Sequence, residues 1–226
     1  MKRILLLAAV SLAATEMNAQ TVSIAPEVGI YAPFTEYNST TGNTIDISHK
    51  IGIKGGANVN LTIAKHLFLQ SGLFFYQTGN KIASTSSYFG TTTSFKSDYN
   101  VNNLQLPLNI GYDLPLGKFG SVFATAGPYV GYALSGSATN NTSVNGEAAP
   151  DRKEDFTFGS DAKDNMKRMD VGFNFGVGIK MRQGVYVRAQ YGLGLTQLSN
   201  VSTTTIKNRG ISATLGYELK LGKKKK

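Results

Sequence analysis

The sequence predicts an all-β protein, namely an eight-stranded antiparallel up-and-down transmembrane β-barrel with short periplasmic turns and long extracellular loops. Three observations predict this fold: a secretory signal at the N-terminus, eight later segments with alternating apolar and polar residues, and connections that are alternately long and short. Alternation with a period of two places the two kinds of residue on opposite faces of a strand. Outer-membrane barrels of bacteria have short periplasmic turns and longer outer loops.

The N-terminus has the organisation of a secretory signal peptide. Lys2 and Arg3 are positively charged, residues 4–14 form an apolar run, and small residues precede a predicted cleavage between Ala19 and Gln20. An N-terminal buried helix is the alternative. The chain is thus expected to comprise a signal peptide (1–19), an outer-membrane β-barrel domain (20–222) and a basic C-terminal tail (223–226). No other stretch approaches the run of about 18 or more apolar residues that a membrane helix needs.

Each alternating segment is long enough to cross a bilayer as a tilted strand, which takes about 9 to 11 residues. The expected strands are Val22–Tyr31, Lys50–Ile63, Leu67–Thr78, Val101–Asp113, Ser121–Leu134, Asp170–Met181, Gly184–Gln197 and Arg209–Leu221. Short connections are expected at residues 64–66, 114–120 and 182–183, and long ones at 32–49, 79–100, 135–169 and 198–208. Both chain ends should then face the periplasm.

One face of these segments is apolar and uncharged, and the other is polar and rich in glycine. In the clearest segment the apolar face holds Leu104, Leu106, Leu108, Ile110, Tyr112 and Leu114. A membrane barrel turns its apolar face to lipid and fills a narrow interior with small and polar side chains. A soluble or lipid-binding periplasmic barrel would invert this arrangement. In the third segment, the aromatic residues Phe68, Phe74 and Tyr76 fall on the inner, otherwise polar face. A bulge or register change could therefore occur there.

Charged residues on the inner face are the best candidates for a functional site in this sequence. They are Glu27, Lys54, Asp113, Lys180, Arg188 and Glu218. Buried charges must be paired and hydrogen-bonded, so we expect a polar network that plugs the lumen, with Arg188 or Lys54 as partners of Glu27 and Glu218. An ion or proton pathway is the functional alternative.

Composition excludes several other classes of site. The chain has no cysteine and only two histidines, so no disulfide framework, lipoprotein acceptor or metal-ligand spacing occurs. We expect no cofactor and no enzymatic activity; His49, near Asp46 and Ser48, is the only catalytic candidate. The net charge is +9, and four of the positive charges are the C-terminal lysines. A solvated tail is expected rather than a nucleic-acid site.

The segments LQLPLNIGYDL, GPYVGYAL, DVGFNFGVGIK, VRAQYGLGLTQL and ISATLGYELKL resemble the PorT-like outer-membrane β-barrel family of Bacteroidetes. The resemblance implies a small porin-like eight-stranded barrel. Most members have no assigned activity, and the namesake is implicated in protein secretion and gliding. The chain departs from such barrels at its end, because four lysines follow Leu221 and Gly222 where an aromatic residue is common.

The sequence therefore favours a structural or interaction barrel of the outer membrane, exported by its signal peptide, with an accessory role in secretion or surface assembly. The alternatives are a narrow pore for ions or small solutes and the soluble or lipid-binding periplasmic barrel. Expected partners are outer-membrane lipid, lipopolysaccharide and other envelope or secretion proteins, with the chain itself a monomer. Binding would rest in the long loops, including the charged residues 149–168 and the aromatic residues Tyr88, Phe89 and Phe95.

Overall fold

The computed structural model describes residues 21–34, 36–39, 46–161, 163–200 and 204–221. The expected signal peptide, its cleavage site at Ala19 and Gln20, and the basic tail lie outside these residues. The strands are β1 (Val22–Pro33), β2 (Glu36–Ser39), β3 (Asp46–Lys50), β4 (Gly52–Thr62), β5 (Leu67–Tyr88), β6 (Thr91–Pro115), β7 (Gly120–Val144), β8 (Glu147–Ala148), β9 (Arg152–Asp155), β10 (Met169–Met181), β11 (Val185–Gly194), β12 (Thr204–Lys207), β13 (Arg209–Tyr217) and β14 (Leu219–Lys220).

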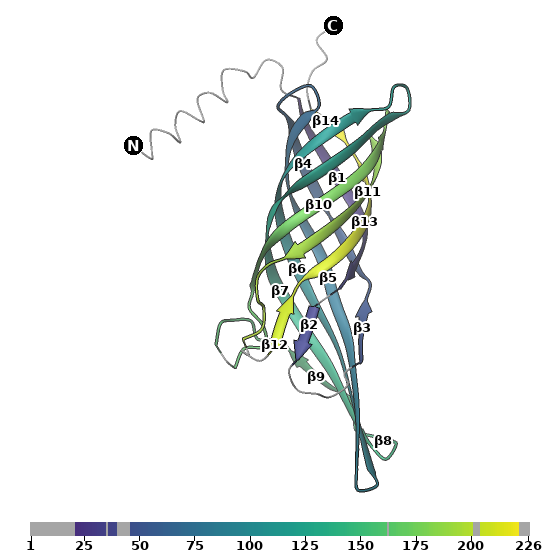
Figure 1. Ribbon diagram of the computed structural model, residues 1–226, viewed down its shortest axis with the longest axis vertical. Coiled ribbons are helices and arrows are strands. Elements are labelled where there is room, and N and C mark those ends of the chain that lie inside the picture. The colour runs from purple at the N-terminus through teal and green to yellow at the C-terminus, as the bar shows by residue number, and fades with distance from the viewer. Residues whose placement is uncertain (1–20, 35, 40–45, 162, 201–203, 222–226) are drawn as a thin grey trace, which may run out of the picture.

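Eight of these strands form a closed antiparallel barrel. In chain order, β1, β4, β5, β6, β7, β10, β11 and β13 each pair with the next, and β13 pairs back with β1. Short turns lie at the end of the barrel where β1 begins, and longer segments lie at the opposite end (Figure 1). The predicted fold class is confirmed. No helix in the described part of the chain is long and apolar enough to cross a membrane.

The alternation of residues along each strand sets the two faces of the barrel wall. On β10, Phe173, Phe175 and Val177 are exposed on the outside, whereas Asp170 and Asn174 are buried inside. Glycines of the inner face leave room for aromatic rings from neighbouring strands: a Cβ at Gly178 would overlap Phe123, and one at Gly216 would overlap Tyr186. The exterior is therefore apolar and the interior polar, the reverse of a soluble lipid-binding barrel.

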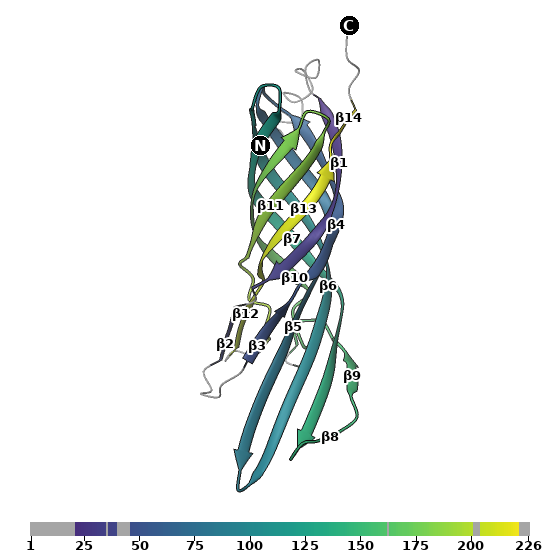
Figure 2. The same cartoon turned by 90° about the vertical axis from the view of Figure 1, so that its right-hand side faces the viewer.

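The loop expected at residues 79–100 is a strand hairpin instead, and the loop expected at 135–169 begins as a strand. β5 and β6 run on beyond the barrel as one continuous hairpin over residues 79–100, and β7 follows them to Val144 (Figure 2). The hairpin turns at Phe89 and Gly90, whose φ angles of 46° and 78° are both positive, as a two-residue type I′ turn requires. Thr and aromatic residues favour strands, and this propensity outweighs the polar composition that suggested a loop.

The inner aromatic residues of β5 cause no irregularity in its pairing. The registers of β5 with β4 and with β6 are each continuous over the described pairs, and Phe74 and Tyr76 are buried inside the barrel. The register shift of the sheet occurs instead between β6 and β7, at Asn102 and Asn103. Aromatic packing on the interior therefore explains the broken alternation without a bulge in β5.

Candidate functional site

The centre of the lumen holds an ion pair between Glu27 of β1 and Arg188 of β11. Their side chains are 0% and 2% exposed. The other Glu27 oxygen accepts hydrogen bonds from the Tyr186 hydroxyl at 2.9 Å and from the Thr214 hydroxyl at 3.4 Å. Arg188 also donates to the Gln70 side-chain oxygen at 2.8 Å. A buried pair held on several sides in this way avoids the cost of leaving either charge alone.

Lys54 lies next to this pair but has a different kind of environment. It is buried on β4, and its Nζ lies 3.3 Å from the Ser212 hydroxyl and 5.1 Å from the centre of the Phe74 ring. The Arg188 guanidinium lies 6.0 Å from the same ring. Phe74 thus contacts two cations through its face. No ion pair involving Lys54 is present among the described residues.

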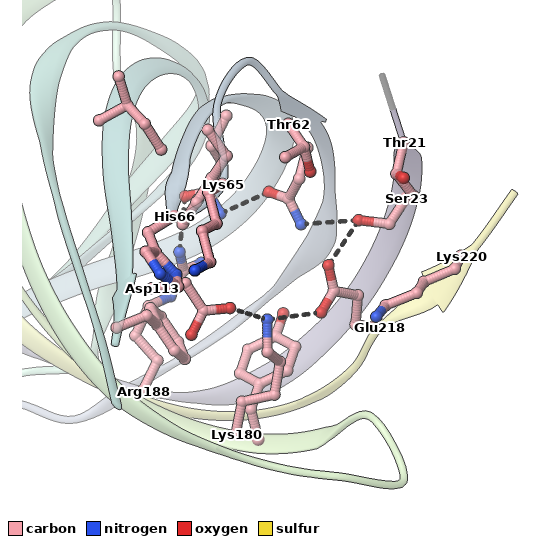
Figure 3. A pocket seen from close by; sticks show the side chains of 16 residues that line it. Thr21, Ser23, Thr62, Lys65, His66, Asp113, Lys180, Arg188, Glu218 and Lys220 are labelled. Carbon is pink, nitrogen blue, oxygen red and sulfur yellow. Dashed lines mark hydrogen bonds and ion pairs between the residues drawn. The ribbon is translucent and has the colours of Figure 1, made fainter. Parts of the chain in front are cut away.

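A second ionic group lies nearer the short-turn end of the barrel. Lys180 of β10 bridges two carboxylates, at 2.6 Å from Asp113 of β6 and 2.9 Å from Glu218 between β13 and β14. Ser23 of β1 donates a hydrogen bond of 2.6 Å to the other Glu218 oxygen. Figure 3 shows Lys180 between the two acids, with Ser23 beyond Glu218.

A chain of side-chain hydrogen bonds joins the two ionic groups. Asn60 donates to Ser23 at 3.3 Å, and Gln70 donates to Asn60 at 2.8 Å. Gln70 in turn accepts from Arg188, so the path from Glu218 to Glu27 is continuous. The structure therefore brings five of the six expected lumen residues, all except Lys54, into one network of hydrogen bonds and ion pairs. Gln70, Asn60 and Phe74 are further members that alternation had placed inside without assigning them a role.

The network lines a cavity of about 290 Å³ at the short-turn end. Among its lining residues are Lys65, His66, Asp113, Lys180, Arg188 and Glu218 (Figure 3). At the other end of the lumen a cavity of only about 10 Å³ lies beside Tyr76, Asn103 and Asp170, and the two cavities share no lining residue. Arg188, Phe74 and Asn58 are among the fully buried side chains of the described residues, and eight-stranded barrels have an interior just wide enough for side chains.

A buried polar group that the sequence analysis missed lies at the long-loop end of the lumen. Asp170 is buried and accepts hydrogen bonds from the Tyr129 hydroxyl at 2.9 Å and from Asn208 at 3.2 Å. Alternation along β10 places Asp170 on the same inner face as Asn174, so its inward position could have been predicted from the sequence.

The two histidines of the chain lie apart from any candidate metal site of the described residues. The described residues contain no group of three or more His, Cys, Asp and Glu side chains that could hold a metal ion. His49 contacts Asn80 of β5, at 2.8 Å between Nδ1 and the amide oxygen. His49 and Ser48 are consecutive residues of β3, so their side chains point to opposite faces. His66 lies at the cavity and packs beside Tyr112, with ring centres 5.8 Å apart.

Comparison with protein families gives a match over residues 18–200 to the family described as outer membrane protein beta-barrel domain. No curated protein sequence matches the chain. Similar solved structures include Ail of Yersinia pestis in complex with the heparin analogue sucrose octasulfate (11% identity, 88% of this chain and 99% of that chain, TM-score 0.41). Others are OprG of Pseudomonas aeruginosa (9%, 88% and 96%, 0.47) and Neisserial surface protein A (14%, 87% and 96%, 0.35). These identities are too low to carry a ligand or partner over to this chain.

Proposed function

Because the chain belongs to the outer membrane protein beta-barrel domain family, we propose that it is a small non-enzymatic barrel that holds a β-sheet outside the membrane as an interaction surface. Its partners are other envelope or secretion proteins, and its role is accessory to secretion or surface assembly, as the resemblance to PorT-like barrels implies. The barrel acts as a monomer in outer-membrane lipid. The length of β5, β6 and β7 carries this proposal.

These three strands are about twice as long as a membrane crossing requires. They have 22, 25 and 25 residues, against about 9 to 11 for a tilted transmembrane strand. We call the extra part, residues 79–88, 91–100 and 136–144, the protruding sheet. The β5 part of the protruding sheet, residues 79–88, has ten residues. At about 3.3 Å per residue and a tilt of about 40°, the protruding sheet extends roughly 25 Å beyond the barrel. Outer loops face the cell exterior in this class of protein.

The tip of the protruding sheet carries two exposed aromatic side chains. Tyr88 is 76% exposed and Phe89 is 91% exposed, and their rings contact each other with centres 4.4 Å apart. Exposed aromatic residues are typical of protein contact surfaces. The tip lies too far from the apolar band for lipid contact to explain these residues, which supports a protein partner.

A crosslinking experiment in intact cells tests this proposal. The chain has no cysteine, so Ser87→Cys places a single attachment point for a photocrosslinker beside the tip. We expect a discrete adduct with an envelope or surface protein, and its loss when Tyr88→Ser and Phe89→Ser are added. The matched control is Phe119→Ser, which removes an 88% exposed aromatic residue at the opposite end. An adduct that persists without the tip aromatics, or no adduct at all, would contradict the proposal.

The lumen is proposed to be closed rather than conducting. The support is the packing of Phe74 and the Glu27–Arg188 pair across the interior. The narrow pore remains the alternative function, and conductance separates the two.

A further inference from the structure

We propose that the protruding sheet has a second role at its base, where Lys81 and Lys96 bind phosphorylated headgroups of the outer-leaflet lipid. The site lies on the outer face of the sheet, which continues the lipid-facing surface of the barrel. It is separate from the aromatic tip and from the lumen, so this inference does not depend on the proposed protein partner.

A ladder of polar side chains marks where the apolar band ends on these strands. Gln77 of β5 donates to Asn102 of β6 at 3.0 Å, and Asn102 donates to Ser135 of β7 at 3.0 Å. On the barrel side of the ladder the outer face is apolar and exposed, at Leu106 and Leu134 for example. Lys81 is four residues beyond Gln77 along β5, which is about 10 Å along the membrane normal. A lysine there can extend its side chain into the headgroup layer.

The register brings the two lysines together on the outer face. Lys81 pairs with Asp98, and Ala83, two residues along β5, pairs with Lys96. Lys81 and Lys96 are thus diagonal neighbours on adjacent strands, a position in which side chains lie about 7 to 8 Å apart at their bases. Each ammonium group can therefore contact one phosphate group of the same headgroup, so a lipid with two phosphates gains both contacts.

The acid nearest to Lys81 is already neutralised by another lysine. Lys50 of β3 pairs with Gly79 of β5 and reaches Asp98 at 2.6 Å. Neither Lys81 nor Lys96 has an ion-pair partner among the described residues, and both are exposed. Their charges are therefore available to an external anion.

The lysines border a shallow hollow of about 580 Å³. Asn100, Thr139 and Asn141 also line it and offer hydrogen bonds to phosphate or sugar oxygens. Asp151 at its edge accepts a hydrogen bond of 2.9 Å from Asn141 and keeps its negative charge, so the lining holds three lysines against two acids. Hydrogen bonds between ammonium and phosphate are charge-assisted and strong, and basic residues at this depth are attracted to anionic lipid. Charge and position together favour a phosphorylated lipid over a protein segment.

Lipid binding to the full chain in nanodiscs tests the inference. The nanodiscs contain phosphatidylcholine with either bisphosphorylated or monophosphorylated lipid A, and native mass spectrometry measures the lipid retained. We expect the wild-type chain to prefer the bisphosphorylated form. Lys81→Gln with Lys96→Gln should weaken its binding on the order of 30-fold, since two headgroup contacts are lost. The matched control, Lys65→Gln with Lys118→Gln, removes the same charge at the short-turn end and should change binding less than about twofold.

A third variant distinguishes the site from a general effect of net charge. Asp98→Asn releases Lys50 from its ion pair and should strengthen binding of the bisphosphorylated lipid. Equal losses in the two lysine double variants, or no preference between the two lipids, would overturn the inference. Complete competition by millimolar inorganic phosphate would also overturn it, because the site would then take a free anion. The crosslink from Ser87→Cys should survive Lys81→Gln and Lys96→Gln, which keeps this result separate from the test of the tip.

Discussion

Glu27 and Arg188 illustrate what alternation can and cannot predict for a single residue. Both lie on the inner face, as their parity indicates. The sequence analysis expected Arg188 or Lys54 as the partner of Glu27, and alternation alone could not choose between them. β1 and β11 both pair with β13, and the structure places Arg188 at the Glu27 carboxylate. Phe74 shows the converse case. It looked like a break in the pattern, yet it is buried inside and contacts the cations of Lys54 and Arg188.

Replacing one partner of the buried pair should strongly destabilise the barrel. Glu27→Gln leaves the Arg188 charge buried without its carboxylate, and we expect a loss of about 3 to 5 kcal/mol in the free energy of unfolding. Urea unfolding in lipid vesicles, followed by the loss of heat-modifiable gel mobility, measures this change. Arg152→Gln is the control, because its pair with Glu154 is exposed and should contribute less than about 1 kcal/mol. Equal effects of the two substitutions would show that the lumen pair is not structurally important.

The strand elements were predictable where they cross the membrane and less so beyond it. Inside the membrane, lipid on one side and a crowded interior on the other enforce strict alternation. The protruding sheet has water on its surfaces, so polar Ser, Thr and Asn residues occur on both faces and resemble a loop. One of its turns was still recognisable in the sequence, because Asn-Gly is a strong indicator of a two-residue hairpin turn. Asn145 and Gly146, after β7, form such a turn with φ angles of 50° and 90°.

The turn between β5 and β6 offers a test of strain at the tip. Phe89 has a positive φ of 46°, which asparagine adopts more readily than phenylalanine. Phe89→Asn should therefore slow hydrogen exchange of backbone amides near the tip, by several-fold if the strain relieved is about 1 kcal/mol. Gly90→Ala, at a φ of 78°, should have the opposite effect. Amides of the barrel strands serve as the internal reference, and an effect spread over the whole barrel would contradict a local origin.

At the scale of the whole molecule, barrel closure followed from the even number of strands and the alternation of long and short connections. The degree to which the lumen is filled did not, because it depends on which side chains meet across the barrel. Lys180 bridging Asp113 and Glu218 brings together β10, β6 and the segment between β13 and β14. Only the closed structure with its strand tilt places these three positions side by side.

The proposed closed lumen predicts that the intact barrel does not form a stable pore. In planar bilayers the wild-type chain should show no large, long-lived open state, because Phe74, Arg188 and Glu27 are buried inside the narrow barrel. Replacing both Phe74 and Arg188 with alanine removes the two largest fully buried side chains of the described residues and should produce measurable openings. Lys50→Ala is the control, because this lysine lies outside the lumen and should leave conductance unchanged. A stable open state of the wild-type barrel would instead support the narrow pore, with Arg188 and Lys180 as the charges that set its ion selectivity.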